Sequence, residues 1–259
     1  MRSPDKSRLR NALRKLQRAE AALGAGIDPQ EAGQDSLDLF ALLAGLKPVF
    51  VLGRGLDDAA WTAGVRDVAR DLALRIVEGP FWDATPYGDD LPGWYVERGR
   101  AALAPFHAWY VCRSEATEQA VRSVNAADGR LAPATEARLL GYPECCVAAH
   151  YDRVLAFHRA TLSILRRQAG GDAARMAALF DEAGRLPPET PAEKAALAAA
   201  AAIVPAPFGS WNMCDACTAD ADGPSARLSR RYAALARTVD SGWAERLAVT
   251  GAPPPRWRP

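Results

Sequence analysis

The chain has 259 residues, of which 49% are hydrophobic and 24% charged, which suits one large or two small folded domains and excludes wholesale disorder. The formal net charge of +1 gives no reason to expect a nucleic acid or an anionic membrane as partner. No run approaches the roughly 20 apolar residues of a transmembrane helix, and the first residues lack the apolar centre of a secretory signal. We therefore expect a cytoplasmic protein without a membrane partner, in a reducing compartment where paired cysteines are metal ligands or redox groups.

The N-terminal half mixes helical and strand patterns. Short apolar runs bounded by glycine or proline predict strands, and longer segments with apolar residues at helical spacing predict helices. Between the second and third strands, a loop rich in glycine and proline carries Trp82 and Tyr87, which are candidates for a pocket wall. The expected elements are helices within 1–45, a strand at 48–52, a helix at 57–71, a strand at 72–77, a loop at 79–93, strands at 94–96 and 108–111, and a helix at 114–124.

The C-terminal half is almost wholly helical in pattern. Proline at expected helix starts and glycine at expected ends mark most of its boundaries. The expected helices are 133–141, 143–168, 172–184, 190–203 and 224–249. This order predicts an α+β fold, with a small mixed sheet in the N-terminal half and a mostly helical C-terminal half. The expected divisions are an N-terminal helical segment at 1–45, an α/β portion at 46–130, a helical cysteine-bearing portion at 131–250 and a tail at 251–259.

Two adjacent cysteines occur at an expected helix start. In the run Leu140-Gly-Tyr-Pro-Glu-Cys-Cys, Gly141 suits the end of one helix and Pro143 the beginning of the next. Cys145 and Cys146 then fall in the first turn, where free backbone N–H groups and the positive end of the helix dipole stabilise a thiolate. The same features suit cysteine sulfur bound to a metal ion or a cluster.

A Cys-x-x-Cys sequence follows an irregular, proline-rich stretch in the C-terminal half. Cys214 and Cys217 have the spacing of a half-site in zinc knuckles and iron–sulfur proteins. Of the five cysteines, only Cys112 stands apart, inside an apolar run that favours simple burial. We expect Cys145, Cys146, Cys214 and Cys217 to meet in one cofactor-binding and metal-binding site.

Three chemistries remain open for these four sulfurs. Adjacent side chains diverge by about 100° around a helix, which is awkward for a single zinc ion but lets two sulfurs reach different irons. We therefore favour a [4Fe–4S] cluster over zinc, with a metal-free dithiol as the third possibility. His150, one turn after Cys146, could be a further ligand or an acid–base partner, but a partly exposed polar role is expected. His158 and His107 have no partner that the sequence identifies.

The two cysteine segments resemble a family of uncharacterised microbial proteins. Its members combine a Gly-Tyr-Pro-x-Cys-Cys box, here residues 141–146, with a C-terminal Cys-x-x-Cys, here residues 214–217. A Ser-rich helix start follows, matched here by Ser225 and Ser229. The resemblance covers about residues 106–240 and implies that the four cysteines matter, without supplying a reaction.

Three functions follow from these alternatives. The favoured one is a [4Fe–4S] protein that acts as a redox, Lewis-acid or sulfur-transfer enzyme on a small-molecule substrate. The second is a zinc-stabilised binding module, and the third is a metal-free thiol–disulfide enzyme. The sequence assigns no catalytic residue, substrate or oligomeric state.

Overall fold

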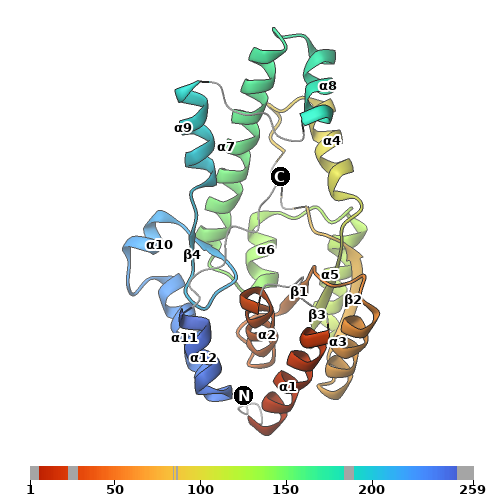
Figure 1. Ribbon diagram of the computed structural model, residues 1–259, viewed down its shortest axis with the longest axis vertical. Coiled ribbons are helices and arrows are strands. Elements are labelled where there is room, and N and C mark those ends of the chain that lie inside the picture. Colours follow the sequence, from red (N-terminus) through yellow and green to blue (C-terminus); the bar gives the residue numbers. More distant parts are fainter. Residues whose placement is uncertain (1–5, 23–28, 84, 86, 184–189, 250–259) are drawn as a thin grey trace.

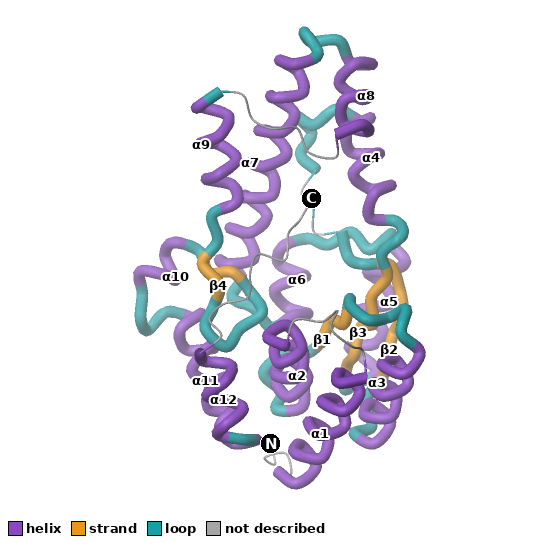
Figure 2. The backbone as a smooth tube through the Cα atoms, in the orientation of Figure 1, coloured by secondary structure: helices purple, strands orange, loops and turns teal. Residues whose placement is uncertain are grey.

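The computed structural model describes residues 6–22, 29–83, 85, 87–183 and 190–249. Helices dominate these residues, and a three-stranded sheet lies in the N-terminal half, which confirms the predicted α+β class (Figures 1 and 2). The elements are, in chain order, α1 Lys6–Ala22, α2 Pro29–Leu43, β1 Val49–Leu52, α3 Ala59–Asp71, β2 Arg75–Pro80, α4 Gly93–Leu103, β3 His107–Cys112, α5 Glu115–Ala126, α6 Pro133–Leu140, α7 Glu144–Gln168, α8 Ala173–Ala183, α9 Pro191–Ala201, β4 Val204–Pro205, β5 Asn212–Met213, α10 Asp215–Ala219, α11 Pro224–Val239 and α12 Ser241–Val249.

The main sheet has the strand order β1-β3-β2, with β3 in the centre. Both pairings are antiparallel, so the expectation of a mixed sheet is corrected. Val49 of β1 and Arg75 of β2 both lie opposite Cys112 of β3. Five of the six β3 residues are buried, because this strand has a neighbour on each edge and packing on both faces.

The predicted strand at 94–96 is wrong, because these residues open the helix α4. Pro92 precedes the helix with an extended backbone, and helix-forming residues continue the segment to Leu103. Only Tyr95 of the apolar trio is fully buried, where it packs with Leu162 and Leu165 of α7. Three consecutive apolar residues span about 200° around a helix. This run therefore places one buried and two partly buried side chains on a helix, and three residues are too few to distinguish that from a strand.

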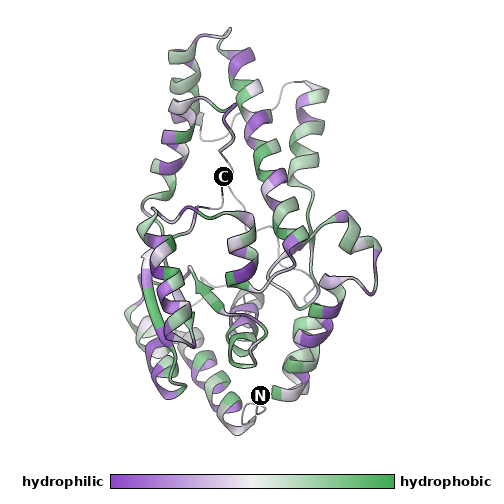
Figure 3. Cartoon of the chain, turned by 180° about the vertical axis from the view of Figure 1, so that it is seen from behind, coloured by the Kyte–Doolittle hydropathy of each residue, from purple (hydrophilic) through white to green (hydrophobic). Residues whose placement is uncertain are grey.

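The long helix α7 is the central element of the C-terminal half. It packs against α6, α8 and α9 and runs from the cysteine pair to the far end of the molecule (Figure 1). Hydrophilic and hydrophobic bands alternate along these helices in Figure 3, as expected for helices that bury one face.

The helices of the two chain ends share the largest hydrophobic core. Side chains of α1 and α2 pack there with those of α11 and α12, and the Arg10 Nε–H donates a hydrogen bond of 2.8 Å to the Val239 carbonyl. The predicted helix at 224–249 is broken at Asp240, whose carboxylate accepts a hydrogen bond of 2.7 Å from the Trp243 backbone N–H and so begins α12. The same core contains Cys146, Cys214 and Cys217.

Within the residues that the structure describes, none of the helices combines the length and the apolar character that crossing a bilayer requires.

Candidate metal centre

The adjacent cysteines lie in the first turn of α7, as the sequence predicts. Gly141 ends α6 in the left-handed conformation, with φ of 70°. A Cβ at this position would also lie 2.9 Å from the Leu46 carbonyl oxygen, so only glycine fits. Pro143 is the N-cap and not the first helical residue, so the helix begins one residue later than expected, at Glu144, whose negative charge lies near the positive dipole end.

A short hairpin that the sequence did not indicate places the second pair. Strands β4 and β5 pair antiparallel, and the turn between them brings Gly209 so close to Trp211 that a Cβ would lie 2.4 Å from the indole ring. Trp211 fills the core, and β5 leads directly into Cys214, the N-cap of α10. Cys217 follows inside this five-residue helix and faces the start of α11.

The four sulfur atoms gather at one point. The Sγ atoms of Cys145 and Cys217 are 3.6 Å apart, and those of Cys146 and Cys214 are 3.8 Å apart. All four lie within 4.8 Å of one another and form a group that could hold a metal ion. Two segments 68 residues apart are thus neighbours in the fold, as predicted from their chemistry.

Three of the sulfurs are inside the protein and one is at the surface. Cys146, Cys214 and Cys217 are buried, whereas Cys145 is exposed. Adjacent helical side chains diverge as expected, since Cys146 points into the protein and Cys145 lies at the surface. Each of them meets one member of the Cys-x-x-Cys, so the divergence does not separate the four sulfurs.

Ser225 connects the sulfurs to the protein core. Its fully buried hydroxyl lies 3.1 Å from the Cys146 Sγ and accepts a hydrogen bond of 3.0 Å from the Trp211 indole N–H. Since a thiolate has no proton to give, the serine O–H is the donor to Cys146 in the ionised state. The Cys214 backbone N–H also points to this sulfur at 3.5 Å. Such neighbours orient a metal ligand and stabilise its charge.

The environment acts unequally on the thiols. Although Cys145 is exposed as a residue, partial desolvation of its sulfur raises its pKa to about 12, helped by hydrogen bonding with Cys217, and burial raises the pKa of Cys146. Burial acts in the same direction on Cys217, but hydrogen bonds from the side chain and backbone of Ser225 outweigh it and lower the pKa of Cys217 to about 7. Of these three, Cys217 is the sulfur that ionises first, and a metal ion has to displace protons from the others.

A buried charged network supports the centre from the side of α2 and β1. The Lys47 ammonium lies 3.1 Å from an Asp38 carboxylate oxygen, and both side chains are buried. It also lies 5.0 Å from the centre of the Tyr142 ring, whose hydroxyl is 2.6 Å from the Ser210 hydroxyl. The network thus joins the Gly-Tyr-Pro box to the hairpin that carries the other cysteine pair. A lysine and an aspartate in separate segments gave no sequence signal of this pairing.

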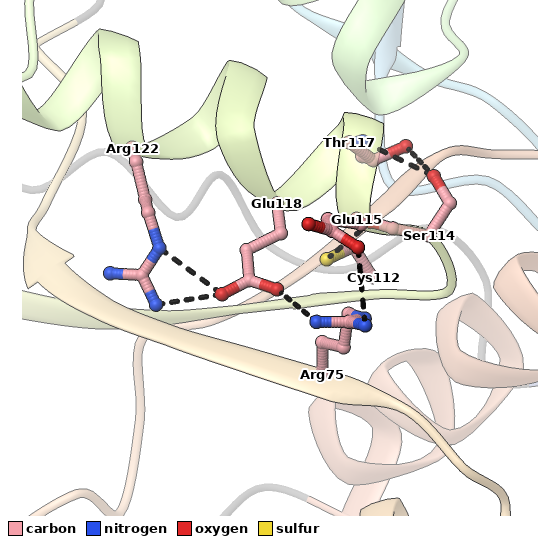
Figure 4. Close-up of polar contacts among 7 residues, drawn as sticks. All are labelled: Arg75, Cys112, Ser114, Glu115, Thr117, Glu118 and Arg122. Carbon is pink, nitrogen blue, oxygen red and sulfur yellow. Dashed lines mark hydrogen bonds and ion pairs between the residues drawn. The ribbon is translucent and has the colours of Figure 1, made fainter.

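Cys112 lies elsewhere, at the end of β3 (Figure 4). It is fully buried, and its sulfur is 3.8 Å from the Ser114 carbonyl oxygen. Burial raises the pKa of its thiol, and the negative charge of the nearby Glu118 raises it further. Glu118 in turn binds the guanidinium groups of Arg75 and Arg122, at 2.6 Å and 2.7 Å. The expected structural role of Cys112 agrees with this packing.

No histidine belongs to the group of potential ligands among the described residues. His150 is partly buried, and burial together with the nearby Arg153 lowers its pKa. The His158 Nδ1 lies within hydrogen-bond distance, 2.8 Å, of the Tyr95 hydroxyl, and its burial lowers its pKa to about 4. His107 is exposed at the start of β3.

Trp82 and Tyr87, the two candidates for a pocket wall, serve packing. Trp82 is buried, stacks on Tyr110 with ring centres 4.2 Å apart, and donates an indole hydrogen bond of 2.9 Å to Asn125. The Tyr87 ring lies 5.1 Å from the Arg100 guanidinium and 6.0 Å from the His158 ring. Trp82 therefore belongs to the core that packs against the sheet, and both rings serve packing.

No family model, curated protein or solved structure matches this chain. The resemblance of the two cysteine segments to a microbial family therefore stays a prediction. What the structure establishes is a cluster of four cysteines that could hold a metal, built by α7, α10 and the start of α11.

Proposed function

We propose that this protein is a binding protein whose four clustered thiolates hold one zinc ion, and that the ion fastens α10 and the β4–β5 hairpin to α7. The observation that carries the proposal is the spacing of the sulfurs, which all lie within 4.8 Å of one another. Four thiolates in a closed set are typical of structural zinc sites.

The spacing supports a single ion. At a Zn–S bond of about 2.3 Å, a tetrahedron separates its sulfurs by about 3.8 Å. The two pairs are separated by 3.6 Å and 3.8 Å. In a [4Fe–4S] cluster each thiolate binds a different iron, so the sulfurs stand farther apart than around one ion. The [4Fe–4S] cluster favoured from the sequence would therefore need larger distances between the four sulfurs.

The surroundings support a fastening role. Strands of two residues and a helix of five are too short to be stable alone, and they carry two of the four sulfurs. An ion shared with α7 would hold these elements against the core. Bound zinc would supply folding free energy there and no redox chemistry.

The test is metal analysis of protein purified without oxygen, together with visible absorption after replacement by cobalt(II). We expect about one zinc ion per chain and the absorption of tetrahedral cobalt with thiolate ligands. Cys146→Ser and Cys214→Ser should lose the metal, while the matched Cys112→Ser should keep it. Iron with inorganic sulfide would replace the proposal by the cluster, and a metal-free protein would leave the dithiol alternative.

A further inference from the structure

A groove begins beside the candidate metal centre and follows α11. It has a volume of about 380 Å³, and Cys217 forms part of its lining. The turn of the β4–β5 hairpin and the residues after α10 form its other walls. This size is within the range of small-molecule sites.

The α11 face in the groove is apolar at one end and positively charged at the other. Ala226, Ala233 and Arg237 share one side of the helix, because their spacings of seven and four residues are whole turns. From Ala226 to Arg237 the helix rises about 16 Å. Ala226 follows Ser225 at the sulfur end, so Arg237 lies at the end remote from the thiolates.

The walls near the sulfurs are mostly apolar, and Phe208, Met213 and Ala226 belong to them. Phe208 has φ of 58°, a left-handed conformation that costs free energy for a residue with a side chain. Asp220 is the acidic residue in this lining, and it follows α10 near Cys217. An anionic group is therefore disfavoured at this end.

Two polar side chains in the lining have no bound partner within the described part of the chain. The Ser229 hydroxyl is one, although Ser229 is only 7% exposed. A buried hydroxyl without a partner is unusual, and an ordered water is the group that most simply supplies one. The Arg237 guanidinium is the other; it is exposed at the end of the groove, and among the described residues no carboxylate pairs with it, whereas Arg230 is bound to Asp222 at 3.0 Å.

We propose that this groove binds a small carboxylic acid with an apolar chain, its carboxylate at Arg237 and its chain directed toward Phe208 and Met213. The inference rests on the proposed function, because the hairpin and α10 form the groove only while the metal centre holds them. A guanidinium matches a carboxylate with two parallel hydrogen bonds. The small side chains of Ala226, Ser229 and Ala233 leave room along the helix for the chain.

The experiment uses decanoate as probe, with decylammonium as its counterpart of opposite charge. Saturable shifts of backbone amide signals along α11 should appear with decanoate and not with decylammonium. Arg237→Gln should weaken decanoate binding about tenfold, the loss of one charge-assisted contact. Arg231→Gln, which removes an exposed charge from the same helix outside the groove, should not weaken it. Arg237→Glu should reverse the preference between the two probes.

Zinc content is measured in every sample, so that the two proposals fail separately. If the protein holds zinc but decanoate gives no saturable shift, the groove proposal is overturned and the metal proposal stands. Equal binding of both probes, or equal effects of Arg237→Gln and Arg231→Gln, would also overturn it. If the protein holds no zinc, the proposed function fails, whatever the probes do.

Discussion

Ser225 is a single side chain on which the cysteine centre depends. It lies between the Trp211 indole N–H and the Cys146 sulfur, so its own proton is directed to the sulfur when the cysteine is ionised. Ser225→Ala should leave the fold intact and lower the affinity for zinc about 10–100-fold, the usual effect of removing a group that orients a ligand. Competition against a chromogenic chelator measures this affinity.

Ser229→Ala, one turn further along α11, is the matched control for Ser225→Ala. Ser229 is also buried, and its hydroxyl has no hydrogen-bond partner within the described residues. Ser229→Ala should therefore leave the zinc affinity unchanged. Equal affinities of Ser225→Ala and the wild type would show that the hydroxyl does not support the ligand.

His158 gives the protein a predictable dependence on pH. Its burial lowers its pKa to about 4 from the ordinary 6.5, so the unfolded chain binds more protons than the folded one between these values. The stabilisation from the neutral, buried ring is complete above pH 6.5 and is lost as the pH falls toward 4. The shift corresponds to about 3.4 kcal/mol of unfolding free energy at most.

Urea unfolding of the wild type and of His158→Asn between pH 7 and pH 5 tests this dependence. The asparagine amide keeps a hydrogen-bonding group beside Tyr95 but does not titrate, so the stability of this variant should fall less over this range. His107→Asn, at an exposed position, should follow the wild type. Parallel curves for His158→Asn and the wild type would contradict the assignment.

At the scale of elements, the Lys47–Asp38 pair joins α2 to the entry of β1. Both charges are buried, with side-chain exposures of 1% and 7%. Lys47→Met should lower the free energy of unfolding by about 3–5 kcal/mol, because Asp38 would stay buried without its counter-charge. The double variant Lys47→Met with Asp38→Leu should recover most of the loss.

Lys15→Met is the control, since the Lys15–Asp71 pair is about half exposed on both sides. Its removal should cost less than about 1 kcal/mol. Denaturant unfolding measures the free energy of unfolding of the wild type, Lys47→Met, the double variant and Lys15→Met. A double variant no more stable than Lys47→Met would show that packing, and not the unpaired charge, causes the loss.

The sequence predicts an element well when the residues that specify it are adjacent in the chain. Helix starts such as Ser114 and the Gly141–Pro143 junction are encoded by adjacent residues, and both are confirmed. The β4–β5 hairpin was missed because two-residue strands are too short for any periodic pattern. The cysteine site was found because only sulfur chemistry was needed to relate its halves, whereas Lys47 with Asp38 and Ser225 with Trp211 depend on packing between distant segments.

At the scale of the whole molecule, the two ends of the chain enclose a common core. Helices α1 and α2 pack with α11 and α12, and three cysteines of the centre belong to the same cluster. The sheet residues Val49, Val77 and Tyr110 belong to a separate cluster, as does Cys112. The opposite face of the sheet, through Phe50, Leu52, Trp109 and Val111, belongs to the cluster that contains the three cysteines. The metal centre thus shares a core with the C-terminal elements and with one face of the sheet, while the other face packs separately.

Removal of the metal should therefore loosen one part of the protein more than another. Amide hydrogen exchange after chelation should accelerate in β4, β5 and α10, which depend on the centre for their position, and at the start of α11. The amides of β1, β2 and β3 should keep most of their protection, because their hydrogen-bonded ladder and the core on one face of the sheet do not include the centre.

Cys214→Ser should reproduce the pattern of chelation without chelator, and Cys112→Ser, a buried cysteine of the other cluster, should not. Uniform acceleration in the sheet and the hairpin would mean that the metal stabilises the molecule as one cooperative unit. Unchanged exchange throughout would mean that packing around Trp211 suffices to hold the hairpin. Local loosening alone agrees with an ion that fastens α10 and the hairpin to α7.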